Sequence, residues 1–264
     1  MTDRSDVDRL VERFSIRGAP TVEWLNELQR QWCFTQPFHN LDLLAGAASH
    51  APPLSREEAI RRCADGLGGP CHVQACGLHA VLTAVGCEAE FAAATIGSAG
   101  DHLLVRATID GRAFLCDVGN GQPYLRPFPQ EEALVQEHLG WRVRSTPERG
   151  GLVVERSSYD QPVPRRVYRT EPGLRHWEDF SDIIRRHHSE IGFGPFLTGL
   201  RVVRMGPDLM VTVRDQVVTW YRAGSFERSV MQPLELVQFL RAELCLGSLP
   251  VSQAVDSWLA RRPR

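Results

Sequence analysis

The stretch Gly68-Gly69-Pro70-Cys71 decides the fold of the first part of the chain, because it sets where a helix begins. Proline suits the first turn of a helix, since its ring fixes φ near the helical value and no N–H is needed there. No other proline follows before Gly86, and glycine is typical of the residue just past a helix. We therefore predict a helix from Cys71 to Val85.

Cys71 lies in the first turn of this predicted helix. Unpaired backbone N–H groups and the helix dipole at that end favour negative charge, and therefore the thiolate, which is the nucleophilic form of cysteine. A second interpretation is a buried structural thiol, because free cysteine is among the most buried residue types. The helix alone leaves both interpretations open.

The composition is that of a globular chain without a basic field. The 264 residues suffice for one large domain or for two to three small ones, and the formal net charge is −2. This charge predicts no nucleic-acid partner. The polar start Met1–Asp8 lacks the features of a signal peptide, and no apolar run reaches the ~18–20 residues of a membrane helix. Seven cysteines without a CxxC pair fit reduced thiols. We expect a cytoplasmic protein with no membrane partner.

Helical patterns precede the Cys71 helix. Apolar residues recur at helical spacing over Asp6–Phe14, and Thr21 is placed to cap a second helix. Gln36–Leu41 breaks the periodicity and is predicted as a loop. Ser55 with Glu58 three residues later forms a capping box at the start of a third helix. The first 86 residues therefore predict a helical bundle.

The pattern changes to strands after Gly86. Asp110-Gly111 lies between the apolar runs His102–Ile109 and Arg112–Val118, and Asp-Gly in that setting indicates a hairpin with a two-residue turn. Further strands are predicted at Phe91–Ile96, Trp141–Ser145, Gly151–Arg156, Arg166–Thr170, Leu200–Met205, Leu209–Arg214 and Gln216–Tyr221. Further helices are predicted at Phe180–Ser189, from Pro233 up to Gly247, and at Ser252–Ala260.

The hairpin places a histidine and a carboxylate on one face. If Asp110-Gly111 is the turn, Ile109 lies opposite Arg112, and the same register puts Leu104 opposite Asp117. His102 shares the face of Leu104, so His102 and Asp117 are diagonal neighbours, roughly 7–8 Å apart at Cα. Their side chains can bridge that distance, and the carboxylate can then fix the histidine tautomer. A strand-end histidine and a turn-forming aspartate are the alternative interpretations.

A cysteine, a histidine and an aspartate in this order match the nucleophile, base and orienting carboxylate of a Cys-His-Asp triad. The chain also carries Pro37-Phe38-His39-Asn40-Leu41, Leu67-Gly68-Gly69-Pro70-Cys71-His72-Val73-Gln74-Ala75, His102 and Asp117-Val118-Gly119-Asn120-Gly121. It resembles the arylamine N-acetyltransferase family over most of its length. The markers of that family are a PFENL segment, an RGGxCxExN segment, a histidine that starts a strand, and a DVGFG segment.

The resemblance implies an α+β fold in which the triad is arranged as in cysteine proteases. The implied domains are a helical domain at 1–86, a β-barrel domain at 87–190 and an α/β lid domain at 191–264. The first carries Cys71, and the second carries His102 and Asp117.

The resemblance also implies the roles of individual residues. Cys71 is expected to take the acyl group, His102 to act as base and Asp117 to orient the histidine. Substrate-binding residues are expected in the same marker segments, at Phe38, His39 and Asn120. No metal and no bound cofactor is expected, and acetyl-CoA or another acyl thioester enters as co-substrate.

The chain departs from the family pattern around the triad. Leu67 replaces the arginine of the cysteine segment, and His39 replaces the glutamate of PFENL. The two lost groups carry opposite charges, and one hypothesis is that they pair in other members and are absent together here. Val73, Ala75 and Asn120 replace further marker residues. These changes predict an altered substrate pocket around a retained triad.

The predicted function is acyl transfer from a thioester to a small amine through an acyl-Cys71 intermediate, in a ping-pong mechanism. The thioester is carried by CoA or by an acyl carrier protein. One alternative is an amide synthase or cyclase of secondary metabolism. Others are a thioesterase or amidase that uses the same triad with water, and a binding module without activity, which the retained triad argues against.

Metal binding is a competing interpretation of the Cys71 helix. His72, Cys76 and His79 lie at i, i+4 and i+7, on one helical face, and three such side chains can bind zinc. Histidine and cysteine on a helix are more often packed in the core, next to residues such as Leu78 and Leu82. We therefore predict no metal site.

The altered pocket leads to a first prediction about substrates. With acetyl-CoA, aniline is expected to be acetylated slowly, because the charged groups expected at positions 39, 67 and 73 are missing. A bulkier acyl thioester is expected to react faster. Steady-state rates with both donors check this, and fast acetylation of aniline, as in other family members, would contradict it.

Overall fold

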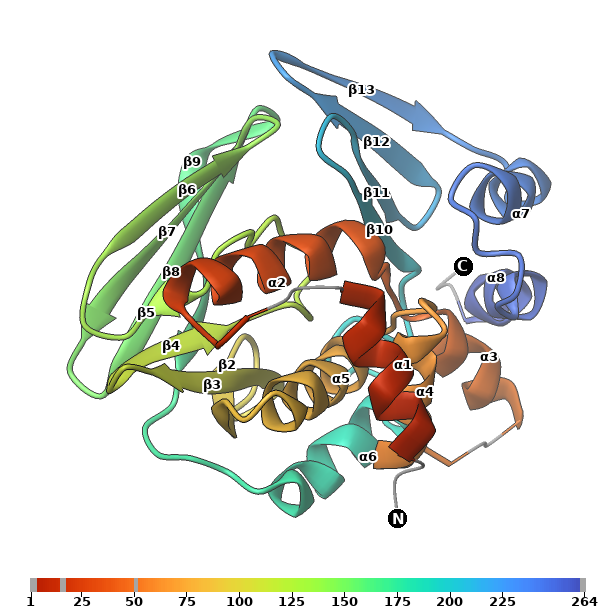
Figure 1. The fold of residues 1–264 in the computed structure, drawn as a ribbon. Coiled ribbons are helices and arrows are strands. Elements are labelled where there is room, and N and C mark those ends of the chain that lie inside the picture. Colours follow the sequence, from red (N-terminus) through yellow and green to blue (C-terminus); the bar gives the residue numbers. More distant parts are fainter. Residues whose placement is uncertain (1–3, 15–17, 50–51, 262–264) are drawn as a thin grey trace.

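The computed structural model describes residues 4–14, 18–49 and 52–261 (Figure 1). Met1–Asp3 of the polar N-terminus and the last three residues of the predicted third domain lie outside the described residues. The helices are α1 (Arg4–Phe14), α2 (Val22–Thr35), α3 (Leu41–Ser49), α4 (Arg56–Ala64), α5 (Cys71–Ala84), α6 (Ser181–Ser189), α7 (Pro233–Ala242) and α8 (Val251–Ala260), with a 3₁₀ turn, η1, at Trp177–Phe180. The strands are β1 (Phe38–His39), β2 (Glu88–Thr95), β3 (His102–Ile109), β4 (Arg112–Cys116), β5 (Phe128–Pro129), β6 (Leu134–His138), β7 (Trp141–Glu148), β8 (Gly151–Ser158), β9 (Gln161–Thr170), β10 (Arg201–Met205), β11 (Met210–Arg214), β12 (Val217–Arg222) and β13 (Ser225–Val230).

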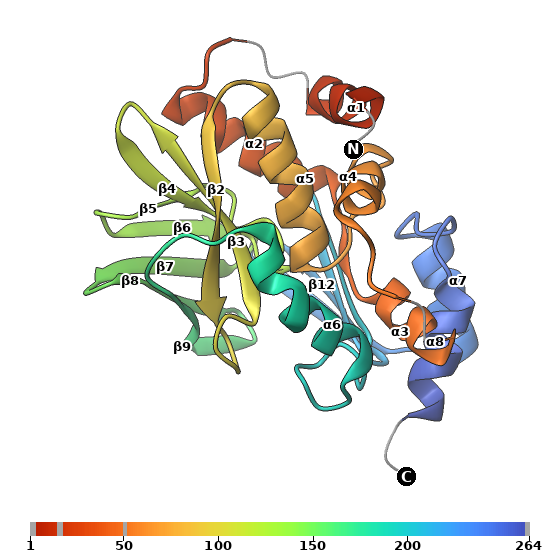
Figure 2. The ribbon, with the colours of Figure 1, turned by 90° about the horizontal axis from the view of Figure 1, so that it is seen from below.

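Helix α5 lies at the centre of the fold, with α1 and α4 on one side and the hairpin β2–β3 on the other (Figure 2), and α2 packs against it through Trp32. Nearly all of its side chains are buried, which matches its lack of a polar face. Its first turn is held by Gln74, whose amide oxygen accepts from Trp32 Nε1 at 3.0 Å and whose amide nitrogen donates to the Gly69 carbonyl at 2.9 Å. The start of α5 is therefore fixed from two directions.

Strands β2 to β9 form one eight-stranded sheet that curls into a nearly closed barrel, with the order β5-β4-β3-β2-β9-β8-β7-β6. The β3–β4 hairpin has the predicted register, with Ile109 opposite Arg112 and Val105 opposite Cys116. Both turn residues have positive φ, 49° at Asp110 and 73° at Gly111, as a type I′ turn requires.

A second, five-stranded sheet has the order β1-β10-β11-β12-β13. Its first strand corrects the sequence prediction: Phe38–His39 is not part of a loop, because Phe38 pairs with Val203 and His39 with Val202 of β10. Helices α3, α7 and α8 share one hydrophobic cluster with this sheet, and Figure 1 shows α7 and α8 beside it. An N-terminal segment therefore forms the edge strand of a sheet whose other strands are C-terminal.

The predicted elements are confirmed where local signals are strong. Thr21 caps α2 by accepting from the Trp24 N–H, and the Ser55 capping box opens α4. The prediction lacked β5, β6 and β13, which lie at sheet edges. It also lacked α3, which consists mostly of small and apolar residues.

The coarse fold class, α+β with a barrel and helices, is as predicted. The division into domains after residues 86 and 190 stays a prediction. In the described part of the chain, no helix has the length and apolar content needed to cross a membrane.

The packing of α5 yields a stability prediction at Gly77. A β-carbon there would lie 2.7 Å from Cys63 Sγ and 2.9 Å from Trp32 Cη2. Overpacking costs about 1–3 kcal/mol, and alanine regains at most about 1 kcal/mol of helix propensity. Gly77→Ala is therefore expected to lower the free energy of unfolding in urea. Thr83→Ala, on the exposed face of α5, is the control, and equal stability of the two variants would contradict the packing.

Candidate active site

Cys71 is the first residue of α5, as the sequence predicted. Pro70 occupies the N-cap position with φ −74° and ψ 179°. Gly68 before it has a positive φ of 64°, and a β-carbon at that residue would lie 2.0 Å from the Pro37 carbonyl oxygen. The turn therefore needs glycine at position 68. It leads the chain directly into α5, with Cys71 at the first position of the helix.

Gly119 packs directly on Cys71. A β-carbon at Gly119 would lie 2.4 Å from Cys71 Cα and 2.9 Å from its Cβ. The Gly119 N–H donates to Asp117 Oδ1 at 3.1 Å. The segment that follows β4 therefore brings the carboxylate and the cysteine to one place, and only glycine fits between them.

His102 and Asp117 meet just beyond the last pair of the β3–β4 ladder. The distance from His102 Nε2 to Asp117 Oδ2 is 2.9 Å, and the two residues are 2% and 1% exposed. The predicted histidine–carboxylate pair is present. The ring of Tyr168 packs beside His102, with centroids 5.4 Å apart, and helps to exclude water.

The surroundings of His102 favour its charged form. Burial by itself lowers the pKa of His102, but the charge and the hydrogen bond of Asp117 outweigh it and raise that pKa to about 10. The side chain of Cys71 lies close enough to His102 to add to this rise in its pKa. Asp117 occupies Nε2, which leaves Nδ1 as the ring nitrogen available to Cys71. In this position His102 can exchange a proton with the Cys71 side chain.

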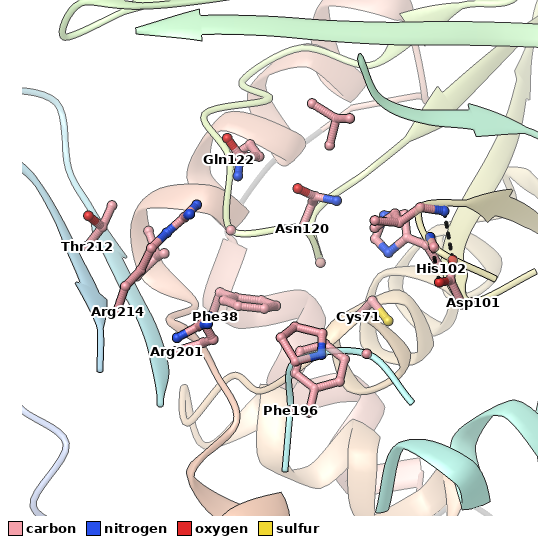
Figure 3. Close-up of a pocket in the computed structure, with 18 of the residues that line it drawn as sticks. Phe38, Cys71, Asp101, His102, Asn120, Gln122, Phe196, Arg201, Thr212 and Arg214 are labelled. Carbon is pink, nitrogen blue, oxygen red and sulfur yellow. Dashed lines mark hydrogen bonds between the residues drawn. The ribbon is translucent and has the colours of Figure 1, made fainter. Parts of the chain in front are cut away.

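A pocket of about 640 Å³ opens over these residues. Cys71 and His102 line it, and so do Phe38 and Asn120, which were expected to bind substrate. Figure 3 shows Phe38 and Asn120 beside Cys71. The structure thus brings these four predicted residues to one cavity, while Asp117 lies behind His102.

His39, the remaining predicted substrate-binding residue, does not line the pocket. Its ring is fully buried, donates from Nε2 to the Leu67 carbonyl at 2.9 Å and accepts from the Leu41 N–H at Nδ1. Burial lowers the pKa of His39, in keeping with a neutral ring that donates and accepts. The sequence hypothesis paired positions 39 and 67 by their lost charges. The two positions are in contact here, but the contact is a hydrogen bond from the buried His39 ring to the Leu67 carbonyl.

Sequence reasoning missed the side chains that complete the pocket. They come from β8, α6, the 190–200 loop and the second sheet, and include Arg156, His187, Phe196, Arg201, Thr212 and Arg214. The only local signal was the cluster of glycines at Gly192 and Gly194, which marks a loop but not its place over Cys71. These residues lie far along the chain from the cysteine, so only the fold reveals them.

The three residues considered as metal ligands have separate partners. His72 Nε2 lies 3.4 Å from His188 Nε2, Cys76 Sγ donates to the Arg56 carbonyl, and His79 stacks on Phe91. Among residues 4–14, 18–49 and 52–261, no group of three or more histidine, cysteine or acidic side chains is arranged to hold a metal ion.

The chain is similar to known proteins over most of its length. A family model described as N-acetyltransferase matches residues 21–247. The curated protein proansamycin X synthase of Amycolatopsis mediterranei (strain S699) is 25% identical over 202 residues, which are 71% of this chain and 75% of that protein.

Solved structures share the fold. The arylamine N-acetyltransferase of Mycobacterium marinum superposes with a TM-score of 0.83 at 20% identity, covering 97% of this chain and 99% of that one. Its complex with CoA gives 0.82 at 18% identity, covering 97% and 100%. The arylamine N-acetyltransferase of Nocardia farcinica gives 0.76 at 25% identity, covering 96% and 93%.

The contact between His102 and Asp117 predicts how Cys71 reacts. Asp117→Asn removes the charge that raises the pKa of His102, so burial then leaves the imidazole neutral near pH 7 and Cys71 loses its cationic neighbour. Alkylation of Cys71 by iodoacetamide is therefore expected to be slower near pH 7 in this variant, because no charged histidine lies beside the sulfur. Peptide mass spectrometry after alkylation at a series of pH values separates Cys71 from the exposed Cys245.

Asp256→Asn is the matched control, since Asp256 is an exposed carboxylate on α8. The control is expected to keep the wild-type alkylation profile. If Asp117→Asn keeps it as well, Asp117 does not set the charge of His102.

Proposed function

The chain belongs to the arylamine N-acetyltransferase family, and from this premise we propose that it moves an acyl group from a thioester to an amine through an acyl-Cys71 intermediate. The observation that carries the proposal is the contact of Cys71 with a charged His102 that is held by a buried Asp117. In this proposal Cys71 is the nucleophile, His102 the acid and base, and Asp117 the orienting carboxylate.

Acetyl-CoA is the proposed donor. The Mycobacterium marinum enzyme of the same fold has a structure in complex with CoA, and the pocket of about 640 Å³ here is within the range of small-molecule sites. No observation supports an acyl carrier protein as partner, and the cytoplasmic location stays a prediction. The donor and the amine are co-substrates, and the proposal includes no bound cofactor.

The first half-reaction acylates the cysteine. The Cys71 thiolate attacks the thioester carbonyl, forming a carbon–sulfur bond and an oxyanion. Backbone N–H groups in the first turn of α5 are the proposed donors to that oxyanion, since they have no partner within the helix. The carbon–sulfur bond to the donor then breaks, and His102 gives its proton to the departing thiolate. The products are acyl-Cys71, a free thiol and a neutral His102.

The second half-reaction returns the enzyme to its starting state. The amine attacks the acyl-Cys71 carbonyl, and neutral His102 takes a proton from the amine nitrogen. The bond to Cys71 breaks and releases an amide and a thiolate. His102 is then charged again and is stabilised by Asp117. In this proposal the thiolate–imidazolium pair is present at the start and at the end of the cycle, while His102 is neutral in the acyl-enzyme.

A second candidate function is the synthesis of an amide within a larger metabolite. The similarity to proansamycin X synthase favours it, and so does the changed surrounding of the triad, where Leu67 and His39 replace charged family residues. The same acyl-cysteine chemistry serves both candidates. They differ in the acyl group and in the amine.

The nucleophile is tested by removing its sulfur. Cys71→Ala is expected to lower acyl transfer from acetyl-CoA by roughly 10³-fold or more, because no other group can form the thioester intermediate. Wild-type protein mixed with acetyl-CoA without an amine is expected to gain the mass of one acetyl group. Intact-protein mass spectrometry and peptide mapping measure this.

Cys245→Ala is the control, because it removes the exposed thiol far from the pocket. It is expected to keep both the activity and the mass gain. If Cys71→Ala retains most of the wild-type rate, the proposed intermediate is wrong.

A further inference from the structure

The side of the pocket across from Cys71 is lined by arginines. Figure 3 shows Arg201, Thr212 and Arg214 there, while Cys71 and His102 lie at the opposite side, with Phe38, Asn120 and Gln122 between. The described lining includes five arginines, which are Arg156, Arg165, Arg166, Arg201 and Arg214. Asp101 is the one acidic residue among them. The far side of the cavity therefore has an excess of positive charge.

Asp101 does not neutralise that charge, because its carboxylate is occupied near the cysteine. It accepts from three consecutive backbone N–H groups, those of Ile96, Gly97 and Ser98, at 2.7 to 2.9 Å. These bonds fix the turn between β2 and β3. The carboxylate thus belongs to the wall beside His102.

Arg156 and Arg214 form no ion pair with any carboxylate in the described parts of the chain. Arg156 stacks on Trp141, with its guanidinium 4.8 Å from a ring centroid. Arg201 beside them is paired with Asp215 at 3.2 Å. Two guanidinium groups thus face the pocket without a counter-charge of their own.

Asp160, a carboxylate in a second cavity beyond the pocket, already has hydrogen-bond partners. Asp160 binds Arg228, and it accepts from Tyr221 Oη at 3.1 Å and from Ser158 Oγ at 2.7 Å. These contacts join the β8–β9 hairpin to β12 and β13 at the far end of the cleft. The charge of Asp160 also acts on Arg156 and Arg214, but both of its oxygens are already bound by Arg228, Tyr221 and Ser158.

The arginines repel one another in this setting. The pKa of Arg214 is lowered first by burial and then by the charges of Arg156 and Arg201. Burial also lowers the pKa of Arg156. A bound anion would relieve this repulsion, and guanidinium groups suit carboxylate and phosphate oxygens because they donate in a planar fork.

The cavity offers room for such a group. Beyond Arg156 and Arg214 a second cavity of about 330 Å³ continues between the two sheets. Trp141, Arg156, Thr212 and Arg214 line both cavities. An anion at the arginines can therefore belong to a substrate longer than the pocket itself.

We propose that Arg156, Arg201 and Arg214 form a subsite for an anionic group, a carboxylate or a phosphate, on a substrate whose reacting group lies at Cys71. The proposal rests on the function proposed above for the Cys71 end of the pocket. The anion has two sources in that reaction: a carboxylate on the amine acceptor, or a phosphate of the CoA donor. In either case Arg156 and Arg214 select substrates by an anionic group that lies away from the Cys71 thiol.

Equilibrium binding tests the subsite apart from the chemistry. Two pairs of probes are compared: 4-aminobenzoate against aniline, which differ by a carboxylate, and CoA against pantetheine, which lacks the phosphates together with the adenosine. Isothermal titration calorimetry measures their dissociation constants with wild-type protein, Arg156→Gln and Arg214→Gln. Arg222→Gln is the matched control, because Arg222 is an exposed arginine at the end of β12 outside the lining.

The expected result is a loss of roughly 10- to 100-fold in affinity for one charged probe in both pocket variants, the size of a charged hydrogen bond. Its uncharged partner and the control variant are expected to change little, and Arg214→Lys to retain part of the affinity. Loss for 4-aminobenzoate assigns the anion to the acceptor, and loss for CoA assigns it to the donor.

Two results would overturn the subsite: charged and uncharged probes that bind wild-type protein alike, or charged probes that bind wild type and both variants alike. The proposed function has a separate readout, the acetyl mass gain on Cys71. Selective anion binding without acylation of Cys71 would contradict the proposed function and support the subsite. Acylation of Cys71 without selective anion binding would support the proposed function and contradict the subsite.

Discussion

The site depends on one buried interaction, the pairing of His102 with Asp117. A charged pair that is less than 3% exposed is stable only when its geometry is good and its remaining atoms find partners. The Gly119 N–H and the Cys71 side chain supply those partners. The pairing therefore requires the β3–β4 register, a glycine at 119, and a helix that begins at Cys71, so that three distant signals in the sequence serve a single contact.

Much of this part was predictable because its signals are local. Asp110-Gly111 fixes the hairpin register within a few residues, and the register alone places His102 and Asp117 on one face. Pro70 and the glycines before it fix the start of α5 in the same way. Short-range signals that agree with one another are reliable, since turn chemistry and strand alternation leave little freedom.

The rest was not predictable, because it depends on residues that are far apart in the chain. Phe38–His39 became a strand only through β10, more than 160 residues later, and its own two residues carry no strand pattern. The same pairing buries His39, which was expected to contact substrate, and its ring donates to the Leu67 carbonyl instead. The arginines of the pocket come from β8, β9, β10 and β11, where each alone resembles a solvated surface charge. Their convergence is a property of how the two sheets face each other.

The central claim is that Asp117 keeps His102 charged beside Cys71 at neutral pH. The most direct test is the protonation state of that ring, observed by NMR on protein with ¹⁵N-labelled histidine and assigned with a His102→Gln variant. The account predicts that both ring nitrogens stay protonated from pH ~6 to pH ~9, above the ordinary histidine pKa of about 6.5. Loss of the ring proton near pH ~6.5 would contradict it.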